Sequence, residues 1–128
     1  MIVFITNGEM ILYGIDNINE KLDKIIESLN LQKQDFELKL IMSEAITNAF
    51  IHGNNSNRSK PIVVKWELNE KFVNITVKDM GKKIGNLVIN KDVEEDILSE
   101  SGRGLNIISL YADEVKFSDS SIIIKKYY

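Results

Sequence analysis

Two neighbouring runs of the chain alternate apolar and polar residues with a period of two. The runs are PIVVKWEL, residues 61–68, and FVNITVKD, residues 72–79, separated only by a short Asn69-Glu70-Lys71 turn. A period of two places successive side chains on opposite faces of a strand. The pattern therefore predicts a β-hairpin whose apolar face must be covered by another layer of structure.

The second of these strands ends in a carboxylate on its apolar side. Val73, Ile75 and Val77 share one face, and Asp79 follows with the same parity. If helices cover that face, Asp79 points toward them too, and a carboxylate in a covered space is costly unless something binds it. Taken alone, this strand favours the simpler alternative in which Asp79 leaves the sheet edge for solvent.

Helical periodicity supplies the covering layer. A first helix is predicted up to about Ser28 after a capping Asp16 or Asn17, and a longer one over residues 32–52, where Gly53 and two asparagines follow. A third opens in SGRGLNII, with Leu105 facing inward. The remaining β-rich runs are 2–5 and 10–13, which form an initial strand or a hairpin around Asn7-Gly8, and then 115–117 and 122–124.

The stretch from about residue 80 to residue 101 shows no regular pattern. Loops of this length are uncommon in compact domains and often act as lids or binding loops, although a short helix could hide here. With 128 residues and 44% hydrophobic content, the chain is predicted to be one domain. Its fold class is α/β, an α+β two-layer sandwich with a mixed, mostly antiparallel sheet of about five strands and three helices on one face.

Composition excludes several classes of function. The chain has 16 basic and 19 acidic residues and a net charge of −3, which argues against an unspecific electrostatic grip on nucleic acid. It has no cysteine, so disulfides, thiolate zinc sites and a cysteine nucleophile are absent. No segment approaches the ~20 apolar residues that span a bilayer, and the start lacks a signal-peptide pattern. We expect a soluble, cytoplasmic protein without membrane contact.

The second helix carries three polar residues at four-residue spacing. In MSEAITNAFIHGN, Glu44, Asn48 and His52 form one slanting row beside an apolar stripe. Farther along, Gly102 and Gly104 flank Arg103 where the third helix opens. Glycines at a helix start let backbone N–H groups approach an anion, although this motif alone is weak evidence.

In their order along the chain, SEAITNAFIHG, VKDMG, a lid-length loop and SGRGLNII resemble the N box and the two glycine boxes of the GHKL (histidine kinase-like) ATPases. The chain looks most like the stand-alone anti-sigma-factor serine/threonine kinases of bacteria, and the resemblance covers nearly its whole length. It implies the Bergerat ATP-binding fold over residues 1–128, with an ATP lid at about 80–101. It also implies ATP and Mg²⁺ as cofactors.

The resemblance implies a role for each matching residue on the second helix and the strand after it. Asn48 would be the magnesium ligand, and Glu44 the general base that takes the proton from an attacking serine hydroxyl or water. Asp79 would accept a hydrogen bond from the adenine amino group, and Gly81 would let the purine lie close to the backbone.

The resemblance also assigns roles to the start of the third helix. Gly102 and Gly104 would line the phosphates, Leu105 would complete the nucleotide site, and Arg103 would stabilise charge on the γ-phosphate. His52 stands at the family's position, yet on a last helical turn it can equally serve the helix dipole or cap a carbonyl. The structural role is favoured for His52.

Two motifs depart from the family pattern. The first glycine box normally reads Asp-x-Gly-x-Gly, and DMGKK places Lys83 at the second glycine, which Gly85 could offset by a shifted loop. The last strand is preceded by Ser120 and Ser121 instead of Gly-Gly-Thr. Both departures predict weaker ATP binding or a different closure of the lid.

The leading interpretation is an ATP-dependent anti-sigma factor with serine kinase activity towards an anti-anti-sigma partner, which regulates transcription. An alternative is a nucleotide-binding partner-switching module with little or no kinase activity, which Lys83 favours. A sensor histidine kinase is disfavoured because the chain's one histidine lies in the nucleotide box. The implied partners are a sigma factor and an anti-anti-sigma protein, with a homodimer expected from the resemblance alone.

Overall fold

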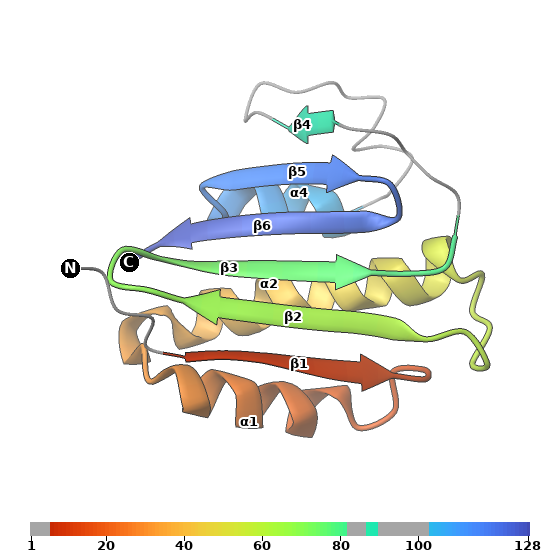
Figure 1. Ribbon diagram of the computed structural model, residues 1–128, viewed down its shortest axis with the longest axis horizontal. Helices are drawn as coiled ribbons and strands as arrows, with labels where there is room; N and C mark the ends of the chain where they lie inside the picture. Colours follow the sequence, from red (N-terminus) through yellow and green to blue (C-terminus); the bar gives the residue numbers. More distant parts are fainter. Residues whose placement is uncertain (1–5, 82–86, 90–102) are drawn as a thin grey trace.

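The computed structural model of the protein describes residues 6–81, 87–89 and 103–128, which are built around one sheet (Figure 1). Six strands follow the order β1-β2-β3-β6-β5-β4, and each neighbouring pair is antiparallel. Their bounds are β1 Thr6–Leu12, β2 Ile62–Leu68, β3 Phe72–Lys78, β4 Leu87–Ile89, β5 Glu114–Ser118 and β6 Ser121–Tyr127. The largely antiparallel sheet is confirmed, with β4 as an additional short strand inside the segment expected to be a lid.

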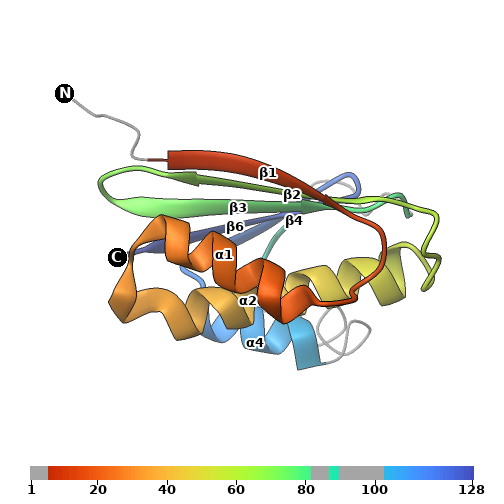
Figure 2. The same cartoon turned by 90° about the horizontal axis from the view of Figure 1, so that it is seen from below.

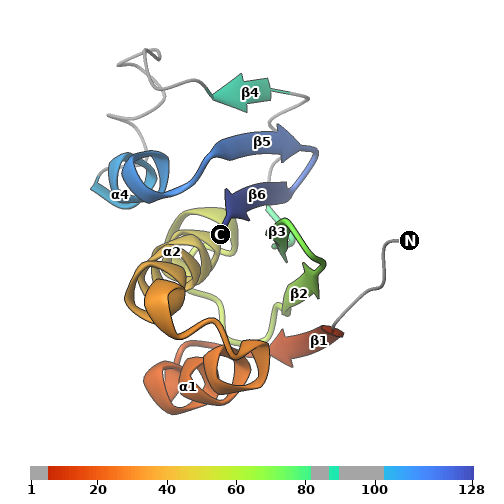
Figure 3. The same cartoon turned by 90° about the vertical axis from the view of Figure 1, so that its left-hand side faces the viewer.

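Three helices, α1 Ile18–Leu29, α2 Asp35–Asn48 and α4 Arg103–Tyr111, lie on one side of the sheet (Figures 2 and 3). α2 occupies the middle of this layer between α1 and α4, and the core lies between the layers. The α2 side chains in this core are Leu38, Ile41, Met42, Ala45 and Ile46. None of the helices within the described ranges is long and apolar enough to cross a membrane.

The predicted hairpin is present as β2 and β3. Val64 pairs with Val77 and Leu68 with Val73, and all four side chains are buried. Each fully buried aliphatic side chain of this kind stabilises the fold by roughly 1.5–3 kcal/mol. The alternation in the sequence therefore places one face of the hairpin against the helices, as predicted.

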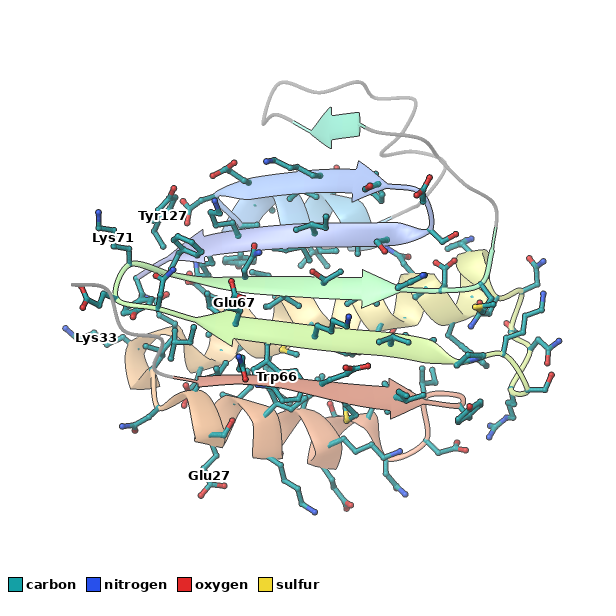
Figure 4. All side chains as sticks on the ribbon, in the orientation of Figure 1. Glu27, Lys33, Trp66, Glu67, Lys71 and Tyr127 are labelled. Carbon is teal, nitrogen blue, oxygen red and sulfur yellow. The ribbon has the colours of Figure 1, made fainter. Side chains whose placement is uncertain are left out.

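β1 is a single strand that runs through Asn7 and Gly8, so the hairpin alternative is wrong. Gly8 pairs with Trp66 of β2, and a Cβ on Gly8 would lie under 3.0 Å from the indole ring. Figure 4 shows Trp66 reaching from β2 across β1. The glycine makes room for this ring and does not turn the chain. Residues 2–5 lie outside the described part of the chain.

The long helix predicted over residues 32–52 has irregular ends. A 3-10 turn, Gln32–Gln34, precedes α2, and a π-helical turn, Ala49–Gly53, follows it. In this π turn the N–H of Asn54 donates to the carbonyl of Ala49, five residues back, at 2.8 Å. Such wide turns often occur at functional sites.

The C-terminal end of α4 is fastened to β6 and to α2. Lys126 is 8% exposed; its ammonium donates to the carbonyl of Tyr111 at 2.7 Å and pairs with Glu37 at 2.9 Å. The carboxylate of Asp113 accepts a 2.7 Å hydrogen bond from the N–H of Tyr127. A cation at a helix C-terminus is favourable, because it satisfies free carbonyls and the helix dipole. α4 is therefore anchored at the end opposite Arg103.

Candidate functional site

Asp79 follows directly after β3 and is half-buried. Its Oδ1 accepts a 2.7 Å hydrogen bond from the N–H of Gly81, and its own N–H donates to the carbonyl of Ser120 at 3.0 Å. Ser120 Oγ in turn donates to the carbonyl of Gly81 at 3.1 Å. These bonds hold the turn after β3 against the start of β6.

The carboxylate of Asp79 lies against the last turn of the helical run that contains α2. A Cβ on Gly53 would come within 3.0 Å of both carboxylate oxygens, and a Cβ on Gly81 would come equally close to the carbonyl of Gly53. Only glycine fits at these two positions, since backbone and carboxylate fill the space of a side chain. Asp79 therefore points toward the helices, and the solvent-facing alternative that this strand alone favours is wrong.

Burial changes the acidity of Asp79. Loss of hydration raises the pKa of its carboxyl, and the hydrogen bond from Gly81 only partly opposes this effect. A charged group in such a place is stabilised when a further donor reaches it. The carboxylate can therefore accept further hydrogen bonds where the end of β3 meets the helical run.

Glu44 and Asn48 lie one turn apart on α2 and are both partly exposed. Their neighbours Ala45 and Ala49 are buried on the core side of the helix. The amide nitrogen of Asn48 is buried and has no hydrogen-bond partner among the described residues. Because buried polar atoms are nearly always bonded, this NH₂ group is placed to donate to an acceptor such as water or a phosphate oxygen.

His52 comes four residues after Asn48, beyond the end of α2. It lies in the π turn Ala49–Gly53, which follows α2. Its side chain is exposed. The structural role favoured for His52 stays a prediction.

The glycine-opened helix begins at the same end of the sheet. Arg103, Gly104 and Leu105 form the first residues of α4, while Gly102 lies outside the described residues. Figures 1 and 2 show the start of α4 near the end of α2, where β3 also stops. Lys83 and Gly85 of the first glycine box, and most of the predicted lid, likewise lie outside the described residues.

The sequence interpretation missed Asn54, which is 0% exposed. Its Oδ1 accepts a 2.7 Å hydrogen bond from the N–H of Met80, and its Nδ2 donates to the carbonyls of Lys60 and Pro61 at 3.2 Å each. The HGNN run was used only as a helix-stop signal. No spacing rule distinguishes an asparagine that ends a helix from one that joins three segments.

The donors for a metal are few at this site. Within residues 6–81, 87–89 and 103–128, no group of three or more His, Cys, Asp or Glu side chains is placed to hold an ion. The amide of Asn48 is a suitable neutral oxygen donor for a hard cation that draws its other ligands from phosphate and water. These residues fit a magnesium–nucleotide complex better than a metal caged by protein alone.

Comparison with known proteins agrees with this arrangement. A family model described as "Histidine kinase-like ATPase domain" matches residues 17–124. The anti-sigma F factor of Clostridium perfringens strain SM101 is 32% identical over 114 residues, covering 83% of this chain and 77% of that protein. The anti-sigma F factor of Geobacillus sp. strain WCH70 is 30% identical over 99 residues, covering 71% and 68%. That of Bacillus thuringiensis strain Al Hakam is 33% identical over 99 residues, covering 75% and 64%.

Proposed function

Because the chain belongs to the histidine kinase-like ATPase family, we propose that it binds ATP with Mg²⁺ and phosphorylates a serine of a partner protein. Residues 1–128 would form one ATPase domain with its lid at about 80–101. The observation that carries this proposal is the contact between the Asp79 carboxylate and Gly53, because it joins the end of β3 to the helical run bearing Glu44 and Asn48.

Asp79 would recognise the base. A carboxylate only accepts hydrogen bonds, whereas the adenine edge presents an amino donor. Its raised pKa fits this role, since the buried charge lacks a strong donor until the base is present. Gly81 would let the purine approach the backbone, because a side chain at that position would fill the space beside Gly53.

The phosphates would lie between α2 and the start of α4. Asn48 would hold Mg²⁺ through its amide oxygen, while Gly102, Gly104 and Leu105 would line the phosphates at the helix N-terminus. When bound, ATP and Mg²⁺ would supply the phosphoryl group and neutralise part of its charge. Arg103 would stabilise the negative charge that develops on the γ-phosphate.

Glu44 would act as the general base. It lies one turn before Asn48 on the same helix, so a serine hydroxyl beside the γ-phosphate would fall within its reach. Glu44 would take the hydroxyl proton as the oxygen forms its bond to phosphorus. ADP would leave as the bond between its terminal phosphate oxygen and the γ-phosphorus breaks.

The relatives that we compared are named anti-sigma F factors, which supports a regulatory role of the same kind. We propose that the chain sequesters a sigma factor and that an anti-anti-sigma protein is its serine substrate. A homodimer is part of this proposal by resemblance. The alternative, a nucleotide-dependent partner switch with little kinase activity, rests on Lys83 in the first glycine box.

ATP with Mg²⁺ should raise the melting temperature of the protein by on the order of 10 °C at a concentration about 100 times its dissociation constant. Binding at that level stabilises the folded state by about 2.7 kcal/mol. Differential scanning fluorimetry with ATP, with ATP plus EDTA and with GTP measures the effect. If millimolar Mg·ATP does not shift the melting temperature, the protein does not bind ATP and the proposal fails.

Arg103→Ala should weaken ATP binding roughly 10- to 150-fold and leave ADP binding nearly unchanged. A hydrogen bond to a charged group is worth about 1.5–3 kcal/mol, and only ATP carries the γ-phosphate. Isothermal titration with both nucleotides measures the difference. Arg58→Ala is the matched control, because Arg58 pairs with Asp16 on the exposed surface. Equal loss of both nucleotides would make Arg103 a structural residue.

A further inference from the structure

Asn54 joins three segments of the chain from a fully buried position. It contacts the turn after β3 through Met80 and the approach to β2 through Lys60 and Pro61, and its own N–H closes the π turn. Burying an amide is costly unless its donors and acceptors are paired. Asn54 meets this condition within the protein, so it does not need a ligand.

We infer that Asn54 is a positioning residue that holds the Asp79 carboxylate in place for base recognition, and so sets the selectivity for adenine over guanine nucleotides. The inference rests on the proposed function, in which Asp79 recognises the adenine amino group. It adds a residue that does not contact the nucleotide itself.

The hydrogen bonds around Asp79 show why Asn54 matters. The N–H of Asp79 and the carbonyl of Gly81 are both hydrogen-bonded to Ser120, which lies in the turn between β5 and β6. The N–H of Met80, between them, is bonded at 2.7 Å to Asn54, at the helix side. Among the described hydrogen bonds of this turn, the bond to Asn54 is thus the one that ties it to the end of the helical run.

The orientation of the Asn54 amide is determined by its partners. Two carbonyls, of Lys60 and Pro61, require the NH₂ group, and the N–H of Met80 requires the oxygen. A flipped amide would set donor against donor and acceptor against acceptor. The side chain is therefore held at both ends, and the position of residue 80 follows from it.

Base selectivity depends on this rigidity. Adenine presents an amino donor where guanine presents a carbonyl oxygen. A carboxylate held at one position bonds the first and repels the second, because neither oxygen can donate. If the turn shifts, a water molecule can enter between Asp79 and either base, and the difference between the two bases shrinks.

Two variants remove the bond from opposite sides. Asn54→Ala deletes the acceptor, and Met80→Pro deletes the N–H donor while leaving Asn54 in place. Met80 is 56% exposed, and Asp79 follows a strand, where a residue before proline is readily accommodated. Met80→Pro therefore decides the question if Asn54→Ala does not fold.

Isothermal titration with Mg·ATP and Mg·GTP should show a preference for ATP in the wild type and a fall of about tenfold or more in that preference in both variants. Asn57→Ala is the control for the loop, since Asn57 bonds Ser59 and not Met80. Leu68→Ala is the control for lost stability, because Leu68 is buried in the register pair with Val73, away from Asp79. Both controls should keep the wild-type ratio.

The outcomes distinguish a failure of the proposed function from a failure of the inference about Asn54. If the wild type binds neither nucleotide, the proposed function fails. If it prefers ATP and a folded Asn54→Ala or Met80→Pro keeps the same ratio, the inference about Asn54 is overturned while the proposed function stands. A change of the ratio in Leu68→Ala as large as in Asn54→Ala would also overturn it, because general loosening would then be the cause.

Discussion

Glu44→Gln should lower phosphoryl transfer about 10²- to 10⁴-fold while leaving nucleotide binding close to that of the wild type. Glutamine keeps the size of the side chain but cannot take a proton, and loss of a general base has an effect of this size. Because Glu44 is partly exposed and lies one turn from Asn48, the substitution should not disturb the fold.

Release of ADP in a coupled assay measures transfer to water, and labelled ATP measures transfer to an anti-anti-sigma protein captured from the native cell. Glu27→Gln is the matched control, because Glu27 is exposed on α1 and lies away from α2 (Figure 4). Transfer at the wild-type rate in Glu44→Gln would show that another group removes the proton. A loss of the Mg·ATP melting shift would instead make Glu44 part of the binding site.

Asp79→Asn should weaken ATP binding by roughly 10- to 150-fold and at the same time stabilise the protein without nucleotide. The binding loss corresponds to about 1.5–3 kcal/mol for a hydrogen bond to a charged acceptor. The gain in stability follows from removing a charge that the fold partly desolvates. We expect less than about 1 kcal/mol at neutral pH, because half-burial leaves much of the charge screened by water.

The pH dependence of this gain has a definite sign. The pKa of Asp79 is raised in the folded state, so the folded protein holds this proton more tightly than the unfolded chain. The wild type is therefore stabilised by this group at low pH and loses that contribution as pH rises through the folded pKa. Urea unfolding should show the advantage of Asp79→Asn at pH 7 shrinking toward pH 4.

Asp16→Asn should change stability with the opposite pH dependence. The hydrogen bond and the charge of Arg58 lower the pKa of Asp16, so its small contribution to stability is present at neutral pH and disappears on acidification.

A constant difference in stability between Asp79→Asn and the wild type across the pH range would show that the carboxyl of Asp79 titrates as it does in the unfolded chain.

Much of the fold can be predicted from the sequence because the apolar residues of its strands and helices recur with a clear period. The alternation in residues 61–79 predicts β2, β3 and their buried face. Parity places Asp79 on that same face, but the strand alone favours a solvent-facing carboxylate, and only the contact with Gly53 shows the inward orientation. The helices follow from apolar spacing, and Gly53 with the two asparagines after it indicates where the second helical run stops. These signals lie within single segments, so they can be used without knowing which distant residues each segment contacts.

The features that were not predicted depend on contacts between distant residues. Gly8 lies in a strand, and the ring of Trp66, far along the chain, occupies the space that a side chain at position 8 would need. β4 has only three residues, too few for a periodic signal. The partners of Asn54 lie six, seven and 26 positions away, so its importance emerges only when the three segments are brought together.

The π turn makes the number of residues in this part of the chain as important as their identity. Between Ala49 and Asn54 the backbone closes a ring one residue larger than that of an α-helix. Taking out a single residue here would close this ring to the α-helical size and remove the wide turn that contains Gly53. The chain could then keep Glu44, Asn48 and Asp79 and still lose the place where the Asp79 carboxylate packs against Gly53, so the length of this stretch matters as much as its functional residues.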